Sequence, residues 1–189
     1  IRPFTYACFV IEYKRNDSYG NIEESAALCD RKGSLMEKKP VMLIVDDVEM
    51  HRAILAQFFK AEYDLLEAAD GSEMMALLAE KTVDIILLDL VMPGPDSFDL
   101  LARLKRDERL SAIPVIVTTA RNERTVEVRA MEMGAADFIT KPYNPTIVRC
   151  RVKNVMARME NEWRKLEQAA RERQILEMRH YLETDALTG

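Results

Sequence analysis

The sequence predicts an α/β fold in which five parallel strands form a doubly wound sheet, followed by one long C-terminal helix. Short apolar runs alternate with segments whose apolar residues recur at helical spacing, and this alternation indicates parallel strands joined by helical crossovers. Two of the runs, VMLIVD (41–46) and DIILLD (84–89), are continuously apolar and end in aspartate. Such runs are typical of strands buried on both faces, and we expect the strand order 2-1-3-4-5.

Each element has its own signal. In the first helix, Phe58 follows Ile54 by four positions and Leu55 by three, which places the three residues on one helical face. PVIVTT and ADFIT repeat the apolar pattern of the first strand. The predicted strands are 41–46, 63–67, 84–89, 114–119 and 136–140, and the predicted helices are 49–60, 71–80, 97–106 and 122–133.

Residues 40–143 form the predicted core of alternating strands and helices. The segments before and after this core have a different sequence pattern. Residues 1–39 show no period and are expected to form an irregular N-terminal extension of undetermined role. No proline or glycine interrupts residues 146–184, so residues 144–184 are predicted to form one long helix. Its apolar stripe becomes thin and its faces charged past residue 158, which favours pairing with a second chain as a coiled coil, although the spacing fits a regular heptad poorly. The stripe consists of Val148, Val152, Val155, Met159, Trp163, Leu166 and Ala170.

Composition excludes several classes of function. The net charge of -5 argues against non-specific nucleic-acid binding. The three cysteines have neither metal-ligand spacing nor a paired framework, which favours a reducing, cytoplasmic compartment. No apolar run approaches the roughly 20 residues of a membrane span, so no membrane partner is expected.

Polar residues follow the predicted strands at the edge where the carboxyl ends of parallel strands meet. These residues are Asp46 and Asp47, Asp89, Thr119 and Lys141. Three converging carboxylates repel one another unless a cation lies among them, and oxygen ligands suit Mg²⁺. A carboxylate so placed can attack a phosphoryl group, with Mg²⁺ and the lysine offsetting the charge.

Residues 40–158 resemble the receiver domain of two-component response regulators. The matching motifs are VDD (45–47), LLDLVMPG (87–94), PVIVTTA (114–120) and GAADFITKP (134–142). The resemblance implies a flavodoxin-like fold and a signalling switch that takes a phosphoryl group from a sensor histidine kinase and acts as a homodimer. It implies no enzymatic activity for this chain.

The resemblance also assigns roles at the strand ends. Asp89 matches the phosphoacceptor, and Asp46 and Asp47 match the acidic pair, with Asp47 the direct metal ligand. The main-chain carbonyl of Val91 matches the backbone ligand of Mg²⁺. Thr119 matches the hydroxyl switch residue.

Further residues match less directly or are ambiguous. Lys141 matches the family's lysine, and its bond to Pro142 is expected to be cis. Phe138 matches the aromatic switch position, but it could equally be a core residue. Thr118 is the off-register neighbour of the hydroxyl switch. An apolar Val91 favours slow autodephosphorylation.

A second resemblance covers TDALTG (184–189), which is similar to the DxLTG entry motif of GGDEF-type diguanylate cyclase domains. It implies that residues 185–189 begin a truncated GGDEF domain and that the cyclase output is absent from this chain. Two alternatives stay open. An aspartate-nucleophile phosphatase of the haloacid dehalogenase type would need a second acid where Val91 stands, and a stand-alone receiver would use the coiled coil only as a scaffold. His51 and His180 are both expected on solvated helix faces.

Overall fold

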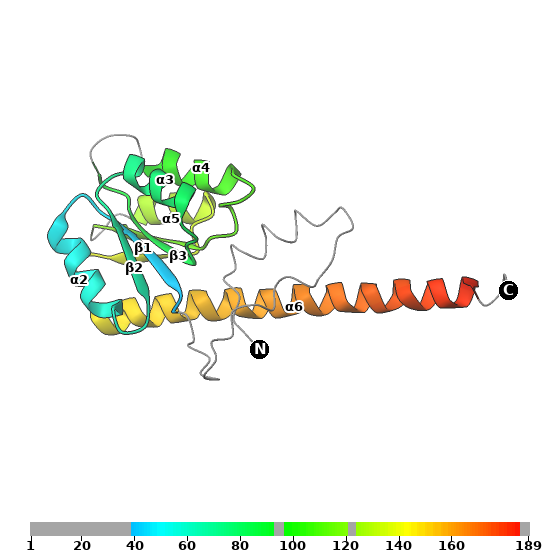
Figure 1. Ribbon diagram of the computed structural model, residues 1–189. Coiled ribbons are helices and arrows are strands. Elements are labelled where there is room, and N and C mark those ends of the chain that lie inside the picture. Colours follow the sequence, from blue (N-terminus) through cyan, green and yellow to red (C-terminus); the bar gives the residue numbers. More distant parts are fainter. Residues whose placement is uncertain (1–38, 93–96, 121–123, 186–189) are drawn as a thin grey trace.

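The computed structural model describes residues 39–92, 97–120 and 124–185, with side chains as far as residue 176 of the last helix. Five parallel strands form one sheet in the order β2-β1-β3-β4-β5, as predicted. Helices cover both faces of the sheet (Figure 1). The elements are β1 (Val41–Val45), α2 (Glu49–Phe59), β2 (Asp64–Ala68), α3 (Gly71–Glu80), β3 (Ile85–Asp89), α4 (Ser97–Arg106), β4 (Val115–Thr119), α5 (Arg124–Glu132), β5 (Asp137–Thr140) and α6 (Pro145–Asp185).

The observed elements agree closely with the predicted ones. Each strand begins and ends within one residue of its predicted bounds. β3 and β4 are buried along their entire length, which is why their sequences are continuously apolar and do not alternate. The predicted N-terminal extension falls outside the described residues except for residue 39, as do residues 186–189 of the cyclase-like motif.

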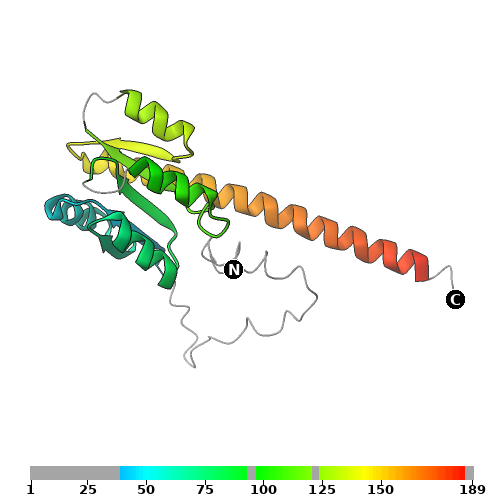
Figure 2. The same cartoon turned by 90° about the horizontal axis from the view of Figure 1, so that it is seen from above.

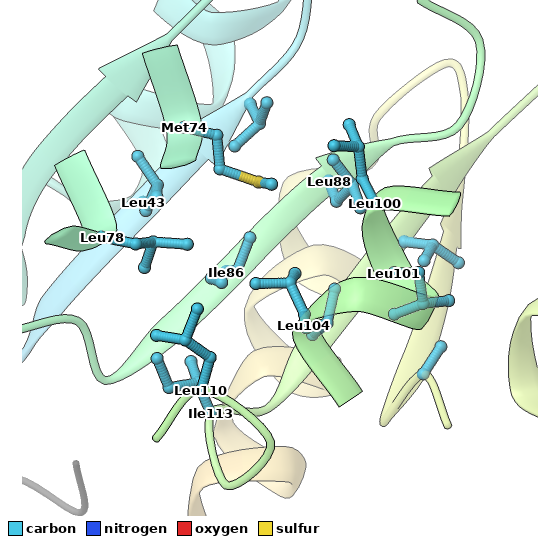
Figure 3. Packing of buried hydrophobic residues seen from close by; sticks show 14 of the residues in the cluster. Leu43, Met74, Leu78, Ile86, Leu88, Leu100, Leu101, Leu104, Leu110 and Ile113 are labelled. Carbon is cyan, nitrogen blue, oxygen red and sulfur yellow. The ribbon is translucent and has the colours of Figure 1, made fainter. Parts of the chain in front are cut away.

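One hydrophobic core lies between the sheet and helices α3 and α4. Met74 and Leu78 of α3 and Leu101 and Leu104 of α4 converge on Ile86 in the central strand (Figure 3). All five side chains are almost completely buried. This packing holds β3 in the middle of the sheet and therefore holds its last residue at the edge where the site forms.

The second core lies on the opposite face, where α2 and the first turns of α6 pack side by side. Leu55 and Phe59 of α2 and Val148, Val152 and Val155 of α6 are buried there. The start of α6 is fixed by the Asn144 side chain, which caps the helix by accepting hydrogen bonds from two backbone amides of the first turn. The helix therefore begins close behind the end of β5.

Beyond these first turns α6 extends well past the sheet (Figures 1 and 2). Arg158 still donates a hydrogen bond to the carbonyl of Ala136 at the edge of the sheet. Farther along, Leu166 is 63% exposed and Leu176 is 64% exposed. The prediction of one continuous helix is confirmed. Within the described part of the chain, no helix is both long and apolar enough to cross a membrane.

Candidate functional site

The register of the sheet gathers four polar residues at the carboxyl ends of the strands. Asp89 pairs with Thr118 across β3 and β4, and Asp46 directly follows the pair formed by Val45 and Leu88. Residues opposite each other in neighbouring parallel strands point to the same face, and so do residues two apart in one strand. Asp46, Asp89 and Thr118 therefore share the face covered by α2 and α6, and Lys141 reaches the same face from the end of β5.

The ammonium group of Lys141 is the centre of this arrangement. Its Nζ lies 2.7 Å from Asp89 Oδ2 and 2.9 Å from Asp46 Oδ2. The two carboxylates are only 2% and 1% exposed, whereas the Lys141 side chain is 19% exposed. The bond from Lys141 to Pro142 is cis, as the resemblance implies. One positive charge thus bridges two buried negative charges.

The two oxygens of Asp89 have different partners. Oδ2 accepts the hydrogen bond from Lys141, while Oδ1 accepts bonds from the amide of Val91 at 3.2 Å and from the Thr118 hydroxyl at 3.3 Å. Burial raises the pKa of Asp89, and repulsion from Asp46 adds to this, although the bonds from Lys141 and Val91 oppose it. The raised pKa means that the site as a whole disfavours the charged form of Asp89 relative to water, despite these hydrogen bonds.

Asp46 is anchored more firmly because it also fixes the start of α2. Its Oδ1 accepts the amide of Val48 at 2.9 Å, and Arg52 donates to its carbonyl at 2.7 Å. Tyr143 donates a hydrogen bond from its hydroxyl to Oδ2 at 3.4 Å, and burial raises the pKa of this phenol.

The ammonium of Lys141 stays charged. Burial alone would lower the pKa of Lys141, but the hydrogen bonds to the two carboxylates outweigh burial and raise the pKa overall.

The expectation that His51 lies on a solvated face is wrong. Its Nδ1 lies 3.1 Å from Asp46 Oδ1 and 3.1 Å from Lys141 Nζ, and its ring meets Tyr143 edge to face with centroids 5.9 Å apart. The signal that could have found it is position. β1 ends at Val45 and α2 begins at Glu49, so the first turn of α2, which contains His51, lies near the strand ends.

The two threonines at the end of β4 do different things. Thr118 donates the bond to Asp89, a contact that the family motif does not assign to it. Thr119 is fully buried, and its hydroxyl has no hydrogen-bond partner among the described residues. A buried hydroxyl left unpaired costs about 1–3 kcal/mol, which an acceptor arriving beside it would recover. The switch role of Thr119 stays a prediction, and this orphan hydroxyl agrees with it.

The remaining predicted residues lie at the rim. Asp47 is exposed, and the described side chains that could jointly hold a metal ion are those of Asp46, His51 and Asp89. Val91 is 60% exposed. The ligand roles of Asp47 and of the Val91 carbonyl stay predictions.

Phe138 lies on β5 and is held by α6. It is half-buried and packs against the core under α3 and α4. The guanidinium of Arg151 lies 4.8 Å from the centre of its ring and also pairs with Asp137 at 2.6 Å. Phe138 is thus partly a core residue and partly a contact between β5 and α6. Its switch role also stays a prediction.

Comparison with known proteins places this site in a family. The sequence model of the response regulator receiver domain matches residues 42–153. The chain belongs to this family. Receiver domains are signalling switches that take phosphoryl groups from histidine kinases and bind Mg²⁺ at an acidic pocket. Asp46 and Asp89 supply the carboxylate oxygens that such a pocket requires, and the donor set therefore fits the ion.

Individual relatives agree with the assignment to the receiver family. The chain is 35% identical over 123 residues to the phosphate regulon transcriptional regulatory protein PhoB of Pseudomonas aeruginosa, covering 65% of this chain and 54% of PhoB. It is 38% identical over 115 residues to the response regulator PleD of Caulobacter vibrioides, covering 60% of this chain but 25% of PleD. A crystal structure of a response regulator from Chloroflexus aurantiacus superposes with a TM-score of 0.61 at 29% identity, covering 64% of this chain and 99% of that one. The receiver thus spans about half of PhoB and a quarter of PleD.

Proposed function

We propose that this receiver accepts a phosphoryl group on Asp89 from a sensor histidine kinase. An oxygen of Asp89 forms a bond to phosphorus while the bond from phosphorus to the kinase's histidine nitrogen breaks, and that nitrogen keeps the electron pair. The observation that carries the proposal is the bridge that Lys141 forms between Asp89 and Asp46, both nearly inaccessible to solvent. Such a bridge holds the acceptor carboxylate in one orientation and keeps a cation beside the oxygens of the incoming group.

The neighbouring residues serve this chemistry. Asp46 and Asp89, with Asp47 and the Val91 carbonyl at the rim, are the proposed ligands of Mg²⁺, which offsets the charge that accumulates between acceptor and phosphoryl group. Lys141 donates to a phosphoryl oxygen once its hydrogen bond to Asp89 opens. The unpaired hydroxyl of Thr119 donates to another.

The proposed output is a change in pairing between two chains. Phosphorylation adds about -1.5 to -2 of charge at pH 7, which draws Thr119 towards the site and shifts the adjoining β5. Phe138 and Arg151 connect β5 to α6, so the change reaches the helix that projects from the sheet. We propose that the projecting part of α6 pairs with that of a second chain and carries the signal to a diguanylate cyclase domain, which the TDALTG motif supports. We also propose a cytoplasmic protein without nucleic-acid or membrane partners, and the net charge of -5 supports the absence of a nucleic-acid partner.

The acceptor role is tested with acetyl phosphate as a small-molecule donor. In Mg²⁺ the intact protein should gain the mass of one phosphoryl group, and in EDTA it should gain none. The Asp89→Asn variant should gain none in either buffer. An Asp89→Asn protein that is phosphorylated to the same extent as the wild type would refute the proposal.

A further inference from the structure

One group beside the Lys141 ammonium is a nitrogen, and the receiver motifs do not account for it. His51 Nδ1 lies 3.1 Å from Lys141 Nζ, and the same ammonium is bound by Asp46 Oδ2 at 2.9 Å and Asp89 Oδ2 at 2.7 Å. Asp46, His51 and Asp89 can each offer one ligand atom, and these atoms lie within 4.8 Å of one another. An imidazole therefore stands among the carboxylates of the acidic pocket.

His51 Nδ1 is equally close to the Lys141 ammonium and to the Asp46 carboxylate. Lys141 can only donate, so Nδ1 accepts if it bonds to the ammonium; the Asp46 carboxylate can only accept, so Nδ1 donates if it bonds to Asp46 Oδ1 at 3.1 Å instead, and the tautomer of His51 decides between the two. The lone pairs of Asp46 and Asp89 meet at the same ammonium. Lys141 Nζ thus marks a position within hydrogen-bond distance of two carboxylate oxygens and one imidazole nitrogen. In the Nε2–H tautomer of His51, a metal ion at this position meets three lone pairs.

The spacing of the donor atoms also suits a metal. Adjacent ligands of an octahedral ion with bonds of about 2.1 Å are about 3 Å apart. His51 Nδ1 and Asp46 Oδ1 are separated by 3.1 Å. His51 is itself held in place, because α2 is anchored through Val48 to Asp46 and because Tyr143 lies against the ring. At 32% exposure, the imidazole can be reached by an ion entering from solvent.

We propose that His51 is a ligand of the cation that this receiver binds, and that it shifts the selectivity of the pocket from Mg²⁺ towards Mn²⁺ and similar transition ions. The inference rests on the proposed function, because it requires a cation held by Asp46 and Asp89. Mg²⁺ takes oxygen ligands almost exclusively, whereas imidazole suits the first-row transition metals. Lys141 leaves the shared position when the ion enters, and its long side chain allows this movement.

Pulsed electron paramagnetic resonance of the full chain with Mn²⁺ alone tests the ligand directly, because an imidazole bound to Mn²⁺ gives a nitrogen coupling. The chain has two histidines, His51 and His180, so His180→Asn is the matched control. The coupling should be present in the wild type and in His180→Asn and absent in His51→Asn. Calorimetry should show that His51→Asn weakens Mn²⁺ binding by about tenfold or more. Mg²⁺ binding should stay within about twofold, since asparagine keeps an oxygen ligand.

The two levels of the proposal fail in different ways. Mn²⁺ that binds without nitrogen coupling, or with a coupling that persists in His51→Asn, overturns the assignment of His51 and leaves the proposed function standing. Equal losses of Mn²⁺ and Mg²⁺ affinity also overturn the selectivity. A wild-type chain that binds neither ion overturns both. If His51→Asn is not folded by circular dichroism, His51→Gln is used with the same criteria.

Discussion

Replacing Lys141 with methionine would leave two buried carboxylates without their common cation. Asp89 and Asp46 are 2% and 1% exposed, and Lys141 Nζ is within 3 Å of both. Removing one member of a buried ion pair typically costs 3–5 kcal/mol, because the remaining charge is uncompensated. Lys141 itself is 19% exposed, so we expect the lower end of that range, a loss of about 3 kcal/mol in the free energy of unfolding.

The cost should depend on charge and not on packing, and three measurements by urea denaturation at pH 7 separate the two. Mg²⁺ should restore stability to Lys141→Met, by about 2.7 kcal/mol at a hundred times its dissociation constant. The double variant Asp89→Asn/Lys141→Met should regain at least about 1 kcal/mol over the single variant, since one of the two opposing charges is gone. Burial raises the pKa of Asp89, and loss of the ammonium raises it further, so protonation relieves the penalty. The loss in the free energy of unfolding of Lys141→Met should therefore be full at pH 7 and become smaller as the pH falls towards about 4.

Lys105→Met is the matched control. Lys105 is also half-buried, but among the described residues its Nζ donates to the backbone carbonyls of Ser111 and Ile113 and to no carboxylate. Any loss in the free energy of unfolding of Lys105→Met should be unchanged by Mg²⁺ or by the additional substitution Asp89→Asn. A Lys141→Met protein that loses less than about 1 kcal/mol, or whose loss Mg²⁺ does not change, would refute the bridged-carboxylate reasoning.

Three other changes give separate tests. Asp70→Ala should destabilise the chain by about 1 kcal/mol in urea denaturation, because Asp70 caps α3 by accepting from the amides of Ser72 and Glu73, whereas Asp70→Asn should be nearly neutral. Gly134→Ala should cost about 1–2 kcal/mol by the same assay, because Gly134 has a φ of 95° and an added Cβ would lie 3.3 Å from Lys105; an unchanged midpoint would contradict this. Trp163→Ala should abolish association promoted by beryllofluoride in sedimentation while leaving phosphorylation of Asp89 intact, and a variant that still dimerises would remove Trp163 from the pairing face.

Strand and helix positions could be predicted because two local patterns decide them. The continuous apolar run of β3 reflects burial on both faces, and the capping residues Asp70 and Asn144 mark where α3 and α6 begin. The convergence of Asp46, Asp89 and Lys141 could be predicted as well, since carboxyl ends of parallel strands meet at one edge.

The position of His51 in the first turn of α2 places it near the strand ends, but its contacts, like those of Thr118, could not be predicted from spacing. The position of His51 depends on how the first turn of α2 is directed after β1, and that direction is set by tertiary bonds such as the one from Arg52 to the Asp46 carbonyl. The bond from Thr118 to Asp89 depends on the register between β3 and β4, which pairs these two residues. Register and helix direction are three-dimensional properties that spacing in one sequence does not determine.

The acceptor role of Asp89 is tested most directly by locating the phosphoryl group within the chain. After reaction with acetyl phosphate and Mg²⁺, tandem mass spectrometry of the peptide that contains β3 should place the group on Asp89. Asp84 is the control, because it is another buried acid at the opposite end of β3 and accepts the amide of Val41, and Asp84→Asn should be modified like the wild type. A phosphoryl group located on Asp46, Asp47 or Asp84, with Asp89 unmodified, would contradict the account.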